Sequence, residues 1–276
     1  MSSSRPPRRW AGFTAAVGLT GSLFLGAPAA SAAPTATEDG RPSAVPLTQV
    51  RPDPDTSRVC RGLVPYPIPP AYRSYYLCGD WRLGPRRLPT QGPVGTILRG
   101  YNRLGGLTAV QFLNRWWLPS ADSGQGDWDY PPDDGFAHDS QGRPLGAPLL
   151  LHASDRLILD RFGNESGRFM SPAGTKFGQR AIPPSNLNTS DPRYPYNYHL
   201  YRLAKDLTVC AGPAAPAFEQ PGGAIQYATA SSSVCPTIPF TTVANLVSNG
   251  TLVRAAVPTD QPKSLQRQPL LHTPAR

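Results

Sequence analysis

The sequence predicts an α+β protein that is rich in loops and stapled by disulfides. Its 276 residues include 34 Pro and 26 Gly, a density that interrupts helices too often for a helical bundle. A hydrophobic fraction of 39% and a charged fraction of 16% support a sizeable core and exclude a chain that is disordered throughout. The apolar residues fall into short runs bounded by turn residues, as in strands. We therefore expect one compact unit of about 200 residues with few helices.

The N-terminus has the features of a secretory signal peptide, assigned to residues 1–32. Three arginines within the first nine residues precede an apolar run from Ala11 to Ala27, followed by the small-residue sequence Ala30-Ser31-Ala32. The run is too short to span the hydrocarbon core of a membrane readily. Cleavage would lower the formal net charge from +9 by three, to +6 (9 − 3), and the mature protein is expected to be secreted and soluble. Residues 33–58 and 258–276 lack apolar periodicity and are predicted to be a flexible spacer and a disordered tail.

The four cysteines form two pairs that are close in sequence. In an oxidising compartment disulfides are preferred to zinc, and none of the cysteines lies in a C-x-x-C arrangement. Of the three connectivities, we favour Cys60–Cys78 and Cys210–Cys235, because each closes a short loop. The even count argues against a catalytic thiol.

Two helices and five strands are predicted between the spacer and the tail. Thr108 is a good N-cap, and the apolar residues from Val110 to Trp117 fall close to helical spacing, which indicates a core-facing helix. A second helix is expected over 243–248, because Asn249-Gly250 is a natural helix stop. Strands are predicted at 157–159, 199–203, 207–209, 224–227 and 252–253.

The common catalytic motifs are missing: there is no G-x-S-x-G, H-E-x-x-H, P-loop or Rossmann fingerprint. Glycosidase chemistry on a neutral sugar usually needs two carboxylates, yet the chain has three glutamates, Glu38, Glu165 and Glu219. Four aspartates lie in a Pro/Gly-rich loop, where solvated turn carboxylates are the plainer interpretation: Asp127, Asp129, Asp133 and Asp134. The four histidines share no metal-ligand spacing, so no metal site is predicted.

Several polar, glycine-containing segments occur in a characteristic order. They include Tyr130-Pro131-Pro132-Asp133-Asp134-Gly135-Phe136, Asp160-Arg161-Phe162-Gly163, Gln179-Arg180-Ala181-Ile182-Pro183-Pro184 and Gly222-Gly223-Ala224-Ile225-Gln226. Arginines in such turns suit a phosphate-bearing ligand. In this order the segments resemble the secreted NAD glycohydrolases that share a domain with the tuberculosis necrotizing toxin, including fungal surface NADases. The first segment is similar to the family's Y-P-P-N-D-G-F motif, with Asp133 in place of Asn.

The resemblance implies a fold and a set of site residues. A mostly antiparallel sheet core, residues 126–257, would follow a small N-terminal subdomain of helices and loops, residues 59–125. Arg161, His199 and Gln226 would be catalytic, while Phe162 and Arg180 would bind substrate, the two arginines clamping the diphosphate and Phe162 packing against a flat ring. Glu219 departs from the pattern, because the family usually has Gly there.

The implied activity is cleavage of NAD to nicotinamide and ADP-ribose. Nicotinamide leaves as a neutral molecule, so no general acid is required, and positioning and electrostatics remain. Calcium, which the fungal enzymes bind, is not favoured, because Asp260 is the only acidic residue after Glu219. The alternatives are an ADP-ribosyltransferase or cyclase, and a secreted basic binding protein or ribonuclease. A homodimer and an immunity protein stay open as partners; nucleic acid and membrane are not expected.

Overall fold

The computed structural model describes residues 56–119, 126–230 and 233–257. All of them lie in one compact unit of the chain, Pro42–Arg276. The predicted signal peptide, most of the spacer and the predicted tail lie outside the described residues. The first helix, α1, begins at Thr56, so the last three residues of the predicted spacer are helical.

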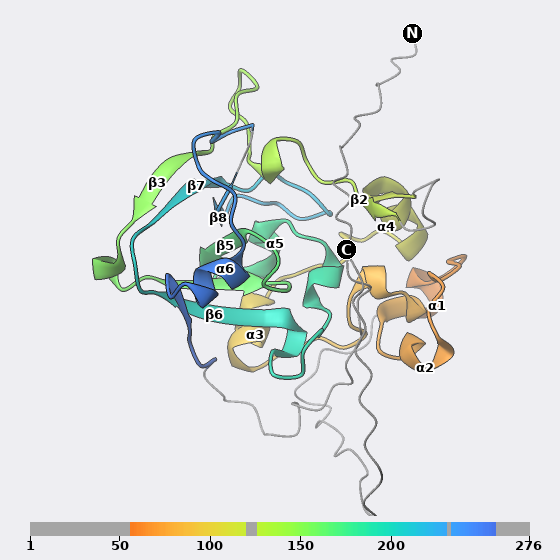
Figure 1. The fold of residues 1–276 in the computed structure, drawn as a ribbon. Helices are drawn as coiled ribbons and strands as arrows, with labels where there is room; N and C mark the ends of the chain where they lie inside the picture. Colours follow the sequence, from red (N-terminus) through yellow and green to blue (C-terminus); the bar gives the residue numbers. More distant parts are fainter. Residues whose placement is uncertain (1–55, 120–125, 231–232, 258–276) are drawn as a thin grey trace, which may run out of the picture. The chain divides into compact units, whose positions relative to one another are not determined.

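A seven-stranded sheet forms the core of the protein (Figure 1). Its strand order is β3-β7-β8-β5-β4-β6-β9, and every neighbouring pair is antiparallel, which confirms the expected sheet type. The strands are β3 (Ala147–Leu151), β4 (Ile158–Phe162), β5 (Phe169–Pro172), β6 (Tyr198–Leu203), β7 (Leu207–Pro213), β8 (Ile225–Ala228) and β9 (Leu252–Arg254), and β1 (Trp117–Leu118) pairs separately with β2 (Asp127–Trp128).

The helices are short, as the Pro and Gly content predicts. The α-helices are α1 (Thr56–Val59), α2 (Pro70–Arg73), α3 (Gly92–Ile97), α4 (Ala109–Trp116), α5 (Phe177–Arg180) and α6 (Val243–Ser248). Single 3₁₀ turns are η2 (Leu77–Gly79), η3 (Trp81–Leu83), η4 (Asp133–Gly135), η5 (Ala153–Asp155), η6 (Pro184–Leu187) and η7 (Pro195–Asn197). In the part of the chain that the structure describes, no helix is both long and apolar enough to cross a bilayer.

Helix α4 confirms the helix predicted after Thr108. The Thr108 side chain accepts a hydrogen bond from the backbone N–H of Gln111, and the Gln111 side chain accepts one from the backbone N–H of Thr108, which is a complete capping box. The helix buries Phe112 and Leu113 in an aromatic cluster that also contains Trp128 and Phe218.

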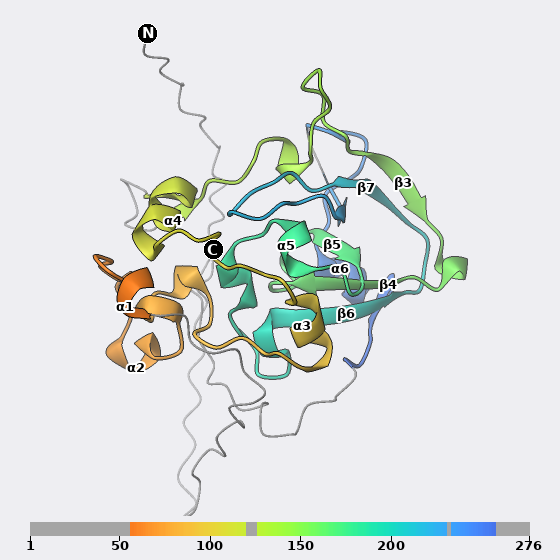
Figure 2. The same cartoon turned by 180° about the vertical axis from the view of Figure 1, so that it is seen from behind.

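The sheet is covered on both faces (Figures 1 and 2). Helix α6 lies over one face, where Val243 and Leu246 pack against Met170 and Tyr201. Helices α3 and α5 lie over the other face, where their side chains pack against Phe162 and Tyr198. Side chains on both faces of the central strands are therefore shielded from water, which strengthens their electrostatic interactions.

Both predicted disulfides are present, Cys60–Cys78 and Cys210–Cys235, and no cysteine is free. The first closes a loop in the chain that precedes helix α3. The second ties β7, the neighbour of the strand that carries Gln226, to the segment after β8.

Candidate functional site

The pairing of β4 with β6 places Arg161 directly opposite His199. Directly opposed residues of an antiparallel pair project from the same face, so the structure brings these two predicted residues together. The Arg161 guanidinium donates to the carbonyl oxygens of Asn164 at 2.8 Å and Phe169 at 2.7 Å. Burial lowers the pKa of Arg161 to about 10, so the side chain keeps its charge at neutral pH.

Gly167, in the turn between β4 and β5, gives the Arg161 side chain its room. A Cβ at this position would lie 1.8 Å from Nη2 of Arg161. A larger residue would therefore displace the guanidinium, which explains a glycine in this segment.

His199 is held as a neutral side chain inside the protein. It is 4% exposed, and its ring stacks on that of Tyr194 with centroids 4.1 Å apart. Among the residues that the structure describes, its Nδ1 has no hydrogen-bond partner, although Oε1 of Glu165 lies 3.8 Å away. Burial lowers the pKa of His199 to about 4, so at neutral pH the imidazole carries no charge.

We predict that protonation of His199 destabilises the fold in acid. An unfolded chain binds this proton near the ordinary pKa of about 6.5, whereas the folded chain resists it until about pH 4. The full free energy of unfolding is therefore kept above about pH 6.5. Between about pH 6.5 and 4 it falls as the pH falls, by at most about 3 kcal/mol. Urea unfolding of the wild type and of His199→Phe over this range should show a flatter profile for the variant. Equal slopes would contradict the prediction, and the exposed His152→Gln variant is the control.

Glu165 is hydrogen-bonded to side chains on β6 and β9. Its Oε1 accepts from the Tyr201 hydroxyl at 3.0 Å and from Nε of Arg254 at 2.8 Å. Burial by itself would raise the pKa of Glu165, but the hydrogen bonds from Arg254 and Tyr201 outweigh it and hold the pKa below its usual range. Glu165 is therefore an ionised structural carboxylate.

Arg180 and Phe162 lie on the opposite face of the sheet. Nη2 of Arg180 is 2.6 Å from Oδ1 of Asp160, and the guanidinium also donates to the carbonyl oxygen of Thr175. Its carbon lies 5.2 Å from the centre of the Phe162 ring. Arg180 is 6% exposed and Phe162 only 2%, so in this conformation the guanidinium is fully engaged and the ring has no free face for a ligand.

Gln226 shares a face with Asp160 and Arg180 rather than with Arg161. Side chains alternate along β8, β5 and β4, and Ala228 pairs with Phe169 and Ser171 with Asp160, which puts Gln226 on the face of Asp160. Gln226 is half-buried, and its Nε2 donates to the carbonyl oxygen of Asp134 at 3.1 Å.

The turn between β4 and β5 links Arg161, on one face of the sheet, to Gln226, on the other. Arg168 of this turn pairs with the Asp134 carboxylate, and Asp134 in turn holds Gln226. Phe169, the next residue, accepts from Arg161. The sequence does not identify Asp134 as the partner of Gln226, or Arg168 as the partner of Asp134; the signal for Asp134 is its place in the Tyr130–Phe136 segment.

Glu219 anchors helix α4 to the chain preceding β8. Its Oε1 accepts from Nη1 of Arg115 at 2.6 Å and from Nε1 of Trp116 at 3.0 Å. Its backbone φ is +59°, in the region that favours glycine, which accounts for the Gly usual at this place. Glu219 is therefore held in a structural contact on α4.

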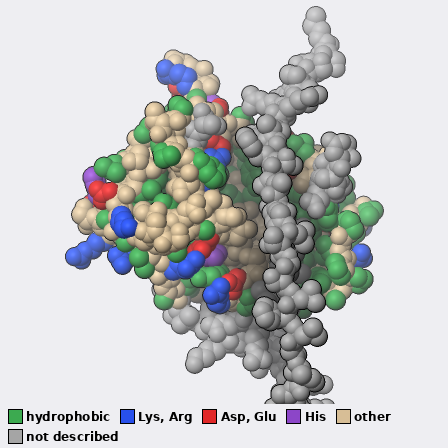
Figure 3. Space-filling model, in the orientation of Figure 1, with side chains coloured by type: hydrophobic (Ala, Val, Ile, Leu, Met, Phe, Trp, Pro, Cys, Tyr) green, Lys and Arg blue, Asp and Glu red, His purple; other side chains and the backbone are tan. Residues whose placement is uncertain are grey.

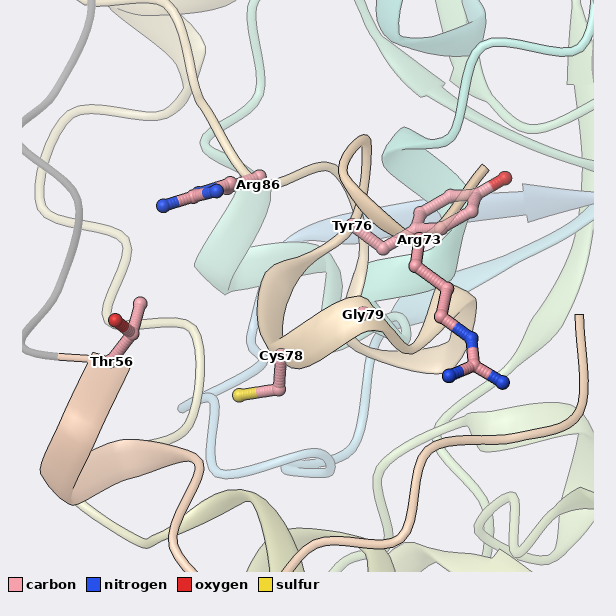
Figure 4. Close-up of a pocket in the computed structure, with 6 residues that line it drawn as sticks. All are labelled: Thr56, Arg73, Tyr76, Cys78, Gly79 and Arg86. Carbon is pink, nitrogen blue, oxygen red and sulfur yellow. The ribbon is translucent and has the colours of Figure 1, made fainter. Parts of the chain in front are cut away.

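A pocket of about 230 Å³ lies beside the Cys60–Cys78 disulfide (Figure 4). It is lined by Thr56, Arg73, Tyr76, Cys78, Gly79 and Arg86. Figure 4 shows the Arg73 and Arg86 side chains turned away from each other. The pocket contains none of the predicted site residues and is smaller than the usual site for a ligand of drug size.

Comparison with known proteins places the sheet residues in a family context. Residues 155–255 match the model of a family described as tuberculosis necrotizing toxin. The conidial surface nicotinamide adenine dinucleotide glycohydrolase of Aspergillus fumigatus is 42% identical over 179 residues, which are 65% of this chain and 70% of the fungal protein. A solved structure of tuberculosis necrotizing toxin with its immunity factor is 22% identical, with a TM-score of 0.39, over 54% of this chain and 72% of the toxin chain.

Proposed function

Because this chain belongs to the family of the tuberculosis necrotizing toxin and the fungal surface NAD glycohydrolase, we propose that it is an NAD glycohydrolase. It cleaves the bond between nicotinamide and ribose and releases nicotinamide and ADP-ribose. The observation that carries this function is the 42% identity to the fungal enzyme over 70% of that protein. The region that matches the family model, residues 155–255, includes strands β4, β6 and β8.

The chemistry of the site agrees with a reaction that needs no general acid. Glu165 is ionised and bound to Arg254, and His199 is neutral at neutral pH. Neither group offers a proton, and the cationic nicotinamide ring needs none as it leaves. Catalysis would depend on Gln226 for orienting the ribose or the attacking water. Arg161 lies on the other face of the sheet from Gln226, so its contact with the diphosphate stays a prediction from the resemblance.

The positions of the glutamates argue against the transferase or cyclase alternative. Such chemistry in related folds normally uses a free glutamate at the site. Glu165 is bound by Arg254 and Tyr201, and Glu219 is bound by two side chains of α4.

The face of the molecule seen in Figure 3 does not have the basic surface that the nucleic-acid alternative needs. There, acidic and basic side chains lie next to one another instead of gathering into a patch of one sign. Nucleic-acid binding usually depends on such a patch.

Incubation of the purified protein with NAD is expected to yield nicotinamide and ADP-ribose in equal amounts. Chromatography of the products should detect no cyclic ADP-ribose, and mass spectrometry should detect no ADP-ribosylated protein. RNA incubated in parallel should stay intact. Cyclic product, modified protein or cleaved RNA without ADP-ribose would favour one of the alternatives.

Calcium is not expected to be required. In the residues that the structure describes, no group of three or more His, Cys, Asp or Glu side chains could hold a metal ion. We predict that a chelator leaves the rate of NAD cleavage and the melting temperature unchanged. Loss of either in chelator, with recovery on adding calcium alone, would show that the prediction is wrong.

We also propose that the protein is secreted and acts outside the producing cell. The predicted signal peptide and the two disulfides favour export to an oxidising compartment, and the fungal relative is named for the conidial surface. An immunity protein is a further proposed partner, since the toxin structure contains one. A homodimer stays a prediction.

A further inference from the structure

Three consecutive residues with left-handed backbone lie next to Gln226. Asp133, Asp134 and Gly135 have φ angles of +54°, +57° and +74°. This conformation costs an L-residue roughly 1–2 kcal/mol, although aspartate tolerates it better than most side chains. Gly135 accepts a hydrogen bond at 2.8 Å from the backbone N–H of Ala215, just after β7. The strained turn is therefore fixed to the hairpin that carries Gln226.

The turn decides which end of the Gln226 amide is available. A carboxamide donates through its nitrogen and accepts through its oxygen. Nε2 of Gln226 is used in the bond to the Asp134 carbonyl oxygen. In the described part of the chain, Oε1 of Gln226 has no hydrogen-bond partner. The end that remains for a ligand is therefore an acceptor.

The Asp134 side chain also holds the turn in place. Its carboxylate pairs with Arg168, and the two side chains are only 16% and 25% exposed. Arg168 also donates to the carbonyl oxygen of Ala230, and its guanidinium lies 4.8 Å from the centre of the Phe169 ring. A shielded, charge-assisted pair of this kind fixes its two segments more firmly than a surface pair does.

We propose that Asp134 is a positioning residue, which fixes the Gln226 amide so that Oε1 accepts a hydrogen bond from a ribose hydroxyl or from the attacking water. Its backbone carbonyl sets the orientation of the amide, and its carboxylate holds the turn to Arg168. This inference rests on the proposed NAD glycohydrolase function. It gives Gln226 one chemical role, that of an acceptor.

The test compares substitutions that differ in their tolerance of a left-handed backbone. Valine is β-branched and strongly disfavours a positive φ, so Asp134→Val should move the carbonyl away from Gln226. We expect kcat for NAD cleavage to fall about 100-fold while KM changes less than about threefold. Asp134→Asn, which tolerates the turn, should lose less than about tenfold. Arg156→Val is the matched control, because exposed Arg156 also has a positive φ, +53°, at a turn before β4.

A double-mutant cycle separates positioning from general damage. If Asp134 acts through Gln226, the Asp134→Val/Gln226→Ala double variant should be no slower than Gln226→Ala alone. Independent, multiplying losses in the double variant would overturn the proposal, as would Asp134→Val with wild-type kcat. A wild-type protein that does not cleave NAD would instead refute the proposed function. Circular dichroism and melting temperatures check that each variant is folded.

Discussion

Replacement of Gln226 by alanine is expected to lower kcat for NAD cleavage by about 100-fold or more, with a much smaller change in KM. The amide is half-buried on β8 and is oriented by one hydrogen bond from Nε2 to Asp134. A group held in advance toward the reacting atoms stabilises the transition state more than the ground state, so its loss appears mainly in kcat. Steady-state kinetics with NAD measure both constants.

Gln141→Ala is the matched control for this experiment. Gln141 is exposed in the turn between Asp139 and Arg143, far in sequence from the predicted site residues, and the same atoms are removed. We expect wild-type kinetics from it. A Gln226→Ala variant with unchanged kcat would remove Gln226 from the catalytic residues, and a rise in KM alone would make it a binding residue.

Replacement of Arg180 by methionine is expected to destabilise the protein by about 3–5 kcal/mol, because removal of one member of a buried pair leaves the other charge uncompensated. Asp160 is fully buried and, within the described residues, would keep only the Tyr198 hydroxyl and the backbone N–H of Gly174 as donors. Burial already raises the pKa of Asp160, with Arg180 opposing the rise. In the variant we expect Asp160 to take up a proton. Urea unfolding at neutral pH measures the loss.

Arg193→Met provides the control for this stability experiment. Arg193 pairs with Asp191 at 2.6 Å, as Arg180 pairs with Asp160, but the Arg193 side chain is 79% exposed. An exposed pair contributes about 0–1 kcal/mol, so this variant should be nearly as stable as the wild type. A loss below about 1 kcal/mol for Arg180→Met, combined with a large rise in KM, would show that the guanidinium leaves Asp160 to bind substrate.

Local patterns predicted those parts of the fold that depend on neighbouring residues. Helix α6 has the predicted bounds, because Thr242 caps its start and Asn249-Gly250 ends it. The disulfides could be predicted since each joins cysteines no more than 25 residues apart. Strands β3 and β5 were not predicted. Pro148 interrupts the signal of β3, and β5 lies in a glycine-rich segment that suggests a turn.

The arrangement of the site could not be predicted in the same way. Arg161 and His199 meet only because β6 pairs with β4, and the sequence does not contain strand order. Arg180 and Phe162 are both buried in the core, and their contact with substrate stays a prediction, which the Arg180→Met variant tests. Burial follows from the packing of α5 against the sheet, which is a tertiary contact.

The order of the strands also bears on how quickly a new chain becomes active. Strands β3, β7 and β8 join the other four strands of the sheet only through the pairing of β8 with β5, in which Phe169 and Ala228 meet across 59 residues of sequence (228 − 169). Contacts this distant in sequence form slowly, because chain entropy is lost before they stabilise anything. Arg161 and Gln226 stand on opposite sides of this junction. The strands that carry Arg161 and Gln226 are therefore joined in one sheet only when this long-range pairing has formed.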